Sequence, residues 1–180
     1  MGVSAVVIED KKGLKKNSLF GTDVKQEQDS IENFCEKIKV GINSKQTDEF
    51  MVIARIESLI LGKGIEDALL RGRSYADSGA NGVLIHSKDK SEELVFQFVE
   101  NFKKDFDVPV IVVPTTYNHI TLDEFKKLGV DIVIYANHLL RSAYPAMLNT
   151  AEEILKFGRT QELEKKLMSV KEVINFIPTD

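Results

Sequence analysis

The sequence predicts an α/β fold built on a parallel sheet, and three features of the chain support this. Short apolar runs rich in Val and Ile alternate with longer stretches whose apolar residues recur at helical spacing. The strand–helix unit repeats roughly every thirty residues, which is close to the length of one βα unit. Polar or ionisable residues follow almost every strand run, and TIM-type barrels place their active sites at the carboxyl ends of their strands. This regularity favours a TIM-type barrel, although an open sheet would have the same local pattern.

Five apolar runs are expected to form the strands: residues 6–8, 50–54, 82–85, 110–113 and 130–135. They are short and rich in β-branched residues, as strands buried on both faces are. A complete eight-unit barrel takes about 250 residues. A chain of 180 residues with five such units therefore predicts a partial barrel.

Helices are expected after each strand run. The first is capped by Asp29 or Ser30 and carries Ile31, Phe34 and Ile38 on one face. Others are expected over 65–76, 94–102 and 122–128. Beyond the fifth strand the pattern is helical to residue 157, Gly158 interrupts it, and a further helix is expected over 163–176. We divide the chain into a partial α/β barrel over 1–145 and a C-terminal helical segment over 146–180.

Composition excludes several classes of protein. With 43% hydrophobic and 29% charged residues, the chain resembles ordinary globular proteins, and the net charge of −4 argues against general nucleic-acid binding. The single cysteine, Cys35, cannot form an internal disulfide, which suits a reducing compartment. No apolar run is long enough to span a bilayer, and the N-terminus has no secretory signal pattern. We expect a cytoplasmic protein with no membrane partner.

Three residues at strand ends are candidates for a binding site. Arg55 follows a buried strand, where its charge needs a partner and its planar fork suits phosphate oxygens. A structural ion pair with Glu57 or Glu9 is the alternative. His86 also follows an apolar strand, but a lone histidine in this position is often only a hydrogen-bonded packing residue. Glu9 also ends a strand run, where α/β folds build their active sites, and a solvated acid is the alternative.

A lysine-rich loop follows the first strand. Lys11, Lys12, Lys15 and Lys16 surround Gly13, and Asn17 and Ser18 come next. Such a loop suits a mobile lid over an anionic ligand, and a solvated basic loop is the alternative.

An ordered set of motifs resembles the phosphoenolpyruvate mutase family of the isocitrate lyase/phosphoenolpyruvate mutase superfamily. The first is Glu9-Asp10-Lys11, five residues, then Asn17-Ser18. The others are Ala54-Arg55-Ile56-Glu57, Ile85-His86-Ser87-Lys88, Val113-Pro114-Thr115, Ala136-Asn137-His138 and Ser169-Val170-Lys171-Glu172. The resemblance covers essentially the whole chain and aligns it with the last five βα units of a TIM barrel.

The resemblance implies an enzyme that converts phosphoenolpyruvate to phosphonopyruvate with Mg²⁺. It implies that Arg55, His86 and Asn17 bind the phosphoryl group, that Lys15, Asn17 and Ser18 belong to a catalytic gating loop, and that Glu9 reaches Mg²⁺ through water. It also implies that the family's phosphoryl-accepting aspartate and direct metal ligand lie in the first three barrel units, which have no counterpart in this sequence. We therefore expect a truncated chain that is inactive by itself.

Two alternatives stay open. Phosphonopyruvate hydrolase resembles the mutase but carries threonine at the position of Asn17, whereas the catalytic cysteine motif of the superfamily's carbon–carbon lyases is missing from this loop. A non-catalytic fragment or oligomerisation module is the other alternative. Family mutases are tetramers with C-terminal helices on a neighbouring subunit. We therefore expect a homo-oligomer in which residues 146–180 pack on the barrel or on another subunit.

Overall fold

The computed structural model describes residues 2–13 and 26–176 and divides into two compact units, Met1–Ala136 and Asn137–Asp180. In these described ranges the first unit contains a sheet and four helices, and the second contains two helices. Among the described residues, no helix combines the length and apolarity needed to cross a membrane.

The first unit is organised around a five-stranded parallel sheet, which confirms the predicted fold class. Its strands pair in sequence order and are β1 (Ala5–Glu9), β2 (Met51–Ile56), β3 (Gly82–Ile85), β4 (Val110–Val112) and β5 (Ile132–Val133). Within the described part of the chain the sheet is open, with β1 and β5 as its edges. The prediction of a fifth strand over 130–135 was too long, because β5 pairs with β4 through only Ile111↔Ile132 and Val112↔Val133.

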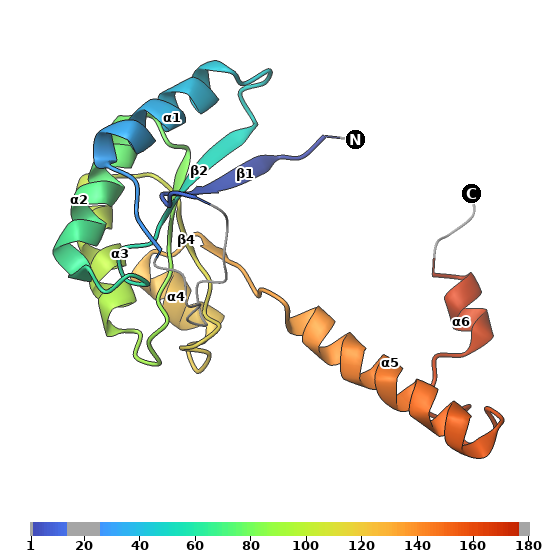
Figure 1. Cartoon of the computed structure of the whole chain (residues 1–180). Helices are drawn as coiled ribbons and strands as arrows, with labels where there is room; N and C mark the ends of the chain where they lie inside the picture. Colours follow the sequence, from blue (N-terminus) through green and yellow to red (C-terminus); the bar gives the residue numbers. More distant parts are fainter. Residues whose placement is uncertain (1, 14–25, 177–180) are drawn as a thin grey trace. The chain divides into compact units, whose positions relative to one another are not determined.

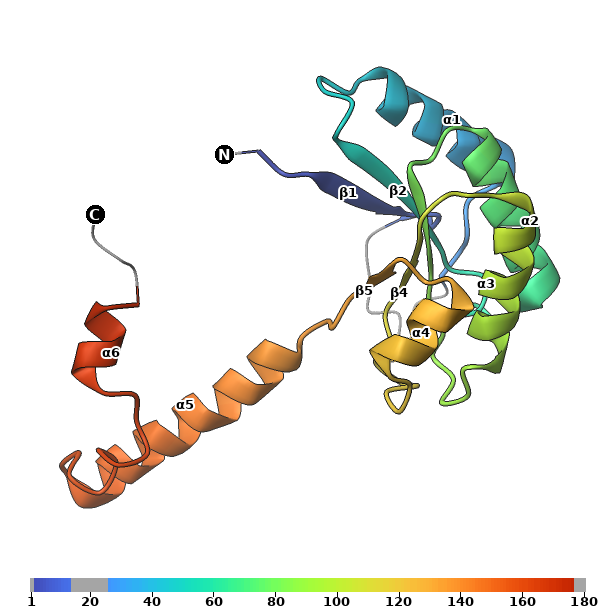
Figure 2. The ribbon, with the colours of Figure 1, turned by 180° about the vertical axis from the view of Figure 1, so that it is seen from behind.

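Four helices cover one face of this sheet: α1 (Ile31–Asn43), α2 (Gly64–Asp77), α3 (Glu93–Asp105) and α4 (Leu122–Leu128) (Figures 1 and 2). The main core lies between them and the sheet, and Ala54, Ile56 and Ile85 are among the strand residues that belong to it. A smaller cluster of Ile53, Leu84, Ile111 and Val113 belongs to the other face. Because successive strand residues point to opposite faces, these two clusters identify the face to which each neighbouring strand residue points.

Local sequence explains where the helices begin and end. Ser30 caps α1 by accepting a hydrogen bond from the Asn33 N–H at 3.2 Å. In α4, Thr121 and Glu124 form a reciprocal capping box, and Gly129 ends the helix at a φ of 97°. These caps lie at the sequence positions where the predicted helices begin and end.

The second unit consists of α5 (His138–Phe157) and α6 (Val170–Ile174). Gly158 ends α5 at a φ of 63°, as its sequence position predicts. The expected helix over 163–176 was wrong in extent. Residues 159–167 form turns and bends, and Ser169 with Glu172 forms a capping box that starts a new helix only at Val170. No side chain of α5 is buried.

Candidate functional site

The candidate site lies at the carboxyl ends of β1, β2 and β3, on the sheet face away from the four helices. Glu9 is paired in register with Arg55. Arg55 lies two residues after Ile53, and His86 lies two residues after Leu84, and both Ile53 and Leu84 belong to the cluster on this face. Strand alternation therefore directs Glu9, Arg55 and His86 to the same side.

Four side chains at these strand ends form what we call the charge ring: Glu9, Lys11, Arg55 and Glu57. Arg55 Nη1 lies 3.3 Å from Glu9 Oε1, and Arg55 Nε lies 2.5 Å from Glu57 Oε1. Lys11 Nζ lies 3.0 Å from Glu57 Oε2 and 3.4 Å from Glu9 Oε2. Each cation therefore contacts both carboxylates, and the charges alternate around a closed circuit.

The charge ring is largely withdrawn from water. The side chain of Glu57 is fully buried, and those of Lys11 and Arg55 are 8% and 17% exposed. At such depth an ionic group is stable only while its partners remain, since removing one leaves an uncompensated buried charge. The ring therefore holds two cationic groups in fixed positions at the end of the sheet.

His86 is a buried neighbour of the charge ring, with 4% of its surface exposed. Burial, and next the positive charge of Arg55, lower the pKa of His86 to about 4. The imidazole nitrogen Nδ1 of His86 has no hydrogen-bond partner among the described residues. At neutral pH this side chain is therefore an uncharged imidazole with one donor and one acceptor nitrogen.

A second polar cluster lies on the helix-covered side of the sheet. This buried network consists of Asp10, Gln28, Ser58, Asp67, Arg71 and Tyr75. Asp10 Oδ2 accepts hydrogen bonds from Tyr75 Oη at 2.7 Å, Gln28 Nε2 at 2.7 Å and Arg71 Nη1 at 3.3 Å. Burial raises the pKa of Asp10, although the hydrogen bonds from Tyr75 and Gln28 act in the opposite direction. The network thus supplies a donor-rich setting for one buried carboxyl group.

The predicted site residues differ in what the structure says of them. Glu9, Arg55 and His86 come together at the carboxyl ends of β1, β2 and β3. Both ion pairs considered as the alternative for Arg55, with Glu9 and with Glu57, are present. Their roles in binding stay predictions, since an ion pair does not test anion binding. Lys15, Asn17 and Ser18, with most of the lysine-rich loop, lie outside the described residues.

Sequence reasoning missed Lys11 as a ring member and missed the buried network altogether. A signal for the network was present in α2, where Arg71 and Tyr75 lie at helical spacing with the apolar Ala68 and Leu69. A charged residue on the buried face of a helix requires an internal partner. The partner, Asp10, is 61 positions away in the chain.

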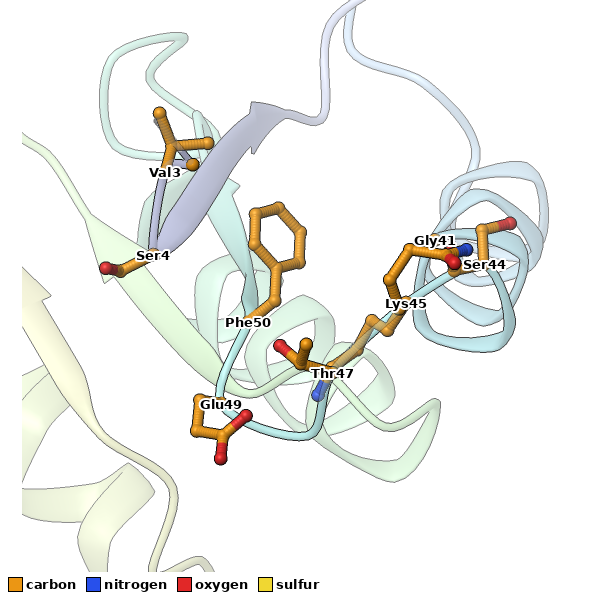
Figure 3. Close-up of a pocket in the computed structure, with 10 residues that line it drawn as sticks. Val3, Ser4, Gly41, Ser44, Lys45, Thr47, Glu49 and Phe50 are labelled. Carbon is orange, nitrogen blue, oxygen red and sulfur yellow. The ribbon is translucent and has the colours of Figure 1, made fainter.

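A separate hollow of about 620 Å³ lies near the amino ends of β1 and β2. Figure 3 shows Val3, Phe50 and Lys45 among the side chains around it. Val3 precedes β1 and Phe50 precedes β2, so the hollow is at the opposite end of these strands from the charge ring. Its lining has no cluster of catalytic side chains, and it is not the candidate active site.

Comparison with known proteins gives consistent matches over nearly the whole chain. A family model described as phosphoenolpyruvate phosphomutase matches residues 1–155. Phosphoenolpyruvate phosphomutase from Tetrahymena pyriformis is 39% identical over 171 residues, covering 95% of this chain and 56% of the relative. Phosphonopyruvate hydrolase from Variovorax sp. (strain Pal2) is 40% identical over 174 residues, covering 96% of this chain and 59% of the relative. The chain thus spans less than two thirds of the length of these curated relatives.

Solved structures give the same result. The crystal structure of phosphoenolpyruvate phosphomutase from Streptomyces platensis subsp. rosaceus matches with a TM-score of 0.89 and 42% identity, over 95% of this chain and 58% of that one. A phosphonopyruvate hydrolase in complex with oxalate and Mg²⁺ matches with a TM-score of 0.83 and 37% identity, over 95% and 57% of the two chains. The two enzyme types are about equally similar to this chain.

Proposed function

The chain belongs to the phosphoenolpyruvate phosphomutase family, within the isocitrate lyase/phosphoenolpyruvate mutase superfamily, and on this premise we propose that it carries the phosphoryl-binding part of an active site that interconverts phosphoenolpyruvate and phosphonopyruvate. In this isomerisation the bond from phosphorus to the enol oxygen breaks and a bond from phosphorus to carbon forms within one substrate. The observation that carries the proposal is the charge ring at the carboxyl ends of the strands, with His86 beside it.

Arg55 and Lys11 supply the electrostatic part of the proposed site. A phosphoryl group in transfer carries negative charge on its equatorial oxygens, and positive groups held in place before the reaction stabilise that charge. The two carboxylates of the ring fix both cations in position. Arg55 has the geometry to bind two phosphoryl oxygens, and Lys11 acts as a point charge.

His86 supplies a neutral polar group at the same edge. Its low pKa means that it contributes a hydrogen bond rather than a positive charge at pH 7. The buried nitrogen Nδ1, which has no partner within the described ranges, is available for a phosphoryl oxygen or a water molecule. We propose that Arg55 and Lys11 bind the phosphoryl charge and that His86 orients the group.

Mg²⁺ is proposed as a cofactor from the relatives, but the described residues do not fit a directly coordinated ion. No group of three or more His, Cys, Asp or Glu side chains in residues 2–13 and 26–176 is arranged to hold a metal. Mg²⁺ takes oxygen ligands and usually keeps several waters. Glu9 suits the role of an outer carboxylate that reaches the ion through water. We therefore propose that the direct ligands come from the barrel units that complete the relatives.

A test of this division uses phosphonopyruvate, Mg²⁺ and phosphorus NMR. We expect no turnover by the 180-residue chain alone. We expect formation of phosphoenolpyruvate after the chain is joined to the preceding barrel units of a relative such as the Tetrahymena enzyme. In the joined protein, Arg55→Gln should abolish turnover. Full turnover by the chain alone would refute the division, and an inactive joined protein that is folded would refute the mutase assignment.

Phosphonopyruvate hydrolysis is the second candidate, favoured by the equal similarity of the Variovorax relative. In that reaction water cleaves the bond between phosphorus and carbon, giving phosphate and pyruvate. Asn17 occupies the position where the resemblance gives threonine for the hydrolase, which supports the mutase. We expect Asn17→Thr in the joined protein to release phosphate, while Lys16→Thr, a matched change in the same loop, keeps phosphoenolpyruvate as the product. Phosphate release by the unmodified joined protein would favour the hydrolase.

We propose that the protein is a homo-oligomer that associates through its second unit. All side chains of α5 are at least partly exposed, although several are large and apolar: Leu139, Leu140, Tyr144, Met147, Leu148 and Leu155. A continuous apolar surface of this kind is typical of an interface.

A further inference from the structure

Asp10 lies where β1 ends and the chain turns away from the sheet. The N–H of Asp10 donates to the Arg55 carbonyl at 3.1 Å, which continues the parallel ladder one residue beyond β1. In such a ladder the next bond would run from the Glu57 N–H to the Asp10 carbonyl. That carbonyl instead accepts the Asp29 N–H at 2.8 Å.

The side chain of Asp10 replaces the missing rung. Its Oδ1 accepts the Glu57 N–H at 3.0 Å. Its Oδ2 is held by the donors of the buried network, including Tyr75 Oη at 2.7 Å and Gln28 Nε2 at 2.7 Å. The carboxylate therefore connects the end of β2 to α2 and to the segment at residue 28, while the main chain of Asp10 is used elsewhere.

This connection ends at the charge ring. Glu57 is fully buried and contacts Arg55 Nε at 2.5 Å and Lys11 Nζ at 3.0 Å. Its position beyond the last residue of β2 depends on the N–H bond to Asp10, because the main-chain ladder has ended there. A shift of the Glu57 main chain would move the carboxylate that holds both cations.

We propose that Asp10 is a positioning residue, which fixes Glu57 and through it sets the orientation of Arg55 for anion binding. This inference rests on the proposed function for its ligand, but its geometric part does not. Three donors hold Asp10 Oδ2 together, Tyr75 Oη, Gln28 Nε2 and Arg71 Nη1, so that Gln28 and Arg71 still anchor Asp10 when the Tyr75 hydroxyl is removed.

Three variants separate positioning from general stability. Asp10→Ala removes the acceptor of the Glu57 N–H. Asp10→Asn keeps an oxygen that can accept this N–H but removes the charge. Tyr75→Phe, the matched control, removes the two hydrogen bonds of the Tyr75 hydroxyl from the same buried network and leaves the contact between Asp10 and Glu57 in place.

The first readout needs no ligand. The Arg55 Nε–H should give a slowly exchanging, downfield NMR signal because it bonds to Glu57 at 2.5 Å. We expect this signal to move to the position of exposed arginines in Asp10→Ala and to stay in Asp10→Asn and Tyr75→Phe. An unchanged signal in folded Asp10→Ala, or an equal change in Tyr75→Phe, would overturn the inference.

The second readout is the affinity for inorganic phosphate, measured by calorimetry. We expect Asp10→Ala to weaken it about tenfold, the size expected for the loss of one buried hydrogen bond, and the other two variants to stay within about twofold. Absence of binding in the unmodified chain would count against the proposed function alone, since the Arg55 signal still decides the role of Asp10. Should Asp10→Ala not fold, amide exchange in the unmodified chain decides. A Glu57 amide that exchanges like an unprotected loop amide would overturn the inference.

Discussion

Replacing His86 by glutamine should remove a large part of the pH dependence of stability in the first unit. The pKa of His86 is about 4 in the folded protein, against an ordinary value of 6.5. Because the folded-state pKa is lowered, the unfolded chain takes up a proton first as the pH falls. The contribution of neutral His86 is fully present above pH 6.5 and is lost progressively as the pH falls towards 4.

The size of this effect follows from the two pKa values. Between pH 7 and pH 5, a histidine that titrates at 6.5 when unfolded and at about 4 when folded lowers the free energy of unfolding by about 2 kcal/mol. The physical cause is burial of the ring, with 4% exposure, and the neighbouring positive charge of Arg55. Both oppose a second positive charge at this position.

The assay is urea unfolding at the two pH values, followed by circular dichroism, for the unmodified chain and for His86→Gln. Other titrating groups, including Asp10, act on both proteins, so the difference between them isolates His86. His119→Gln is the matched control, because the His119 side chain is 59% exposed and pairs with Glu92 on the surface. An equal pH dependence in His86→Gln and the unmodified chain, or an NMR titration of the His86 imidazole centred near 6.5, would show that burial of His86 is not the source of the effect.

Three further outcomes are expected. Glu57→Gln should lower the free energy of unfolding by about 3–5 kcal/mol, because it removes the charge of the fully buried carboxylate that contacts both Arg55 and Lys11, whereas Glu36→Gln in a surface pair should leave the urea midpoint unchanged. An equal midpoint in both variants would contradict this. Gly72→Ala should destabilise the first unit by about 1–3 kcal/mol, since its new Cβ would lie 2.9 Å from Phe98 Cζ. Gly41→Ala meets only ordinary contacts at 3.5 Å and should be neutral or stabilising, so a reversed order in thermal unfolding would be evidence against the packing described. The chain should sediment as a concentration-dependent oligomer, and a single monomer species at all concentrations would exclude association through α5.

Local sequence signals account for most of the strands and helices of this protein. The five apolar runs, Ser30 before α1 and the Gly129 and Gly158 stops are local signals, and local signals fix where strands and helices begin and end. The positions of Glu9, Arg55 and His86 after strands also follow from the order of residues. A parallel sheet then places the carboxyl ends of its strands on the same side, whatever the details of packing. The fifth strand was predicted too long because its length depends on pairing with β4. The last helix was predicted too long because the apolar pattern was followed and the local capping box of Ser169 and Glu172 was not used.

The pairing of the charged residues, by contrast, depends on how distant elements pack together. Glu9 and Asp10 are neighbouring carboxylates that look alike in the sequence, yet alternation along the extended chain sends them to opposite sides of the sheet. One joins the charge ring with Arg55, and the other is buried against Tyr75 and Arg71. Arg55 lies beside Glu9 because β1 pairs with β2, whereas Tyr75 and Arg71 reach Asp10 because α2 packs against β2 and β3. Periodicity records which face of an element is apolar, but it carries no information on which remote charge will lie opposite.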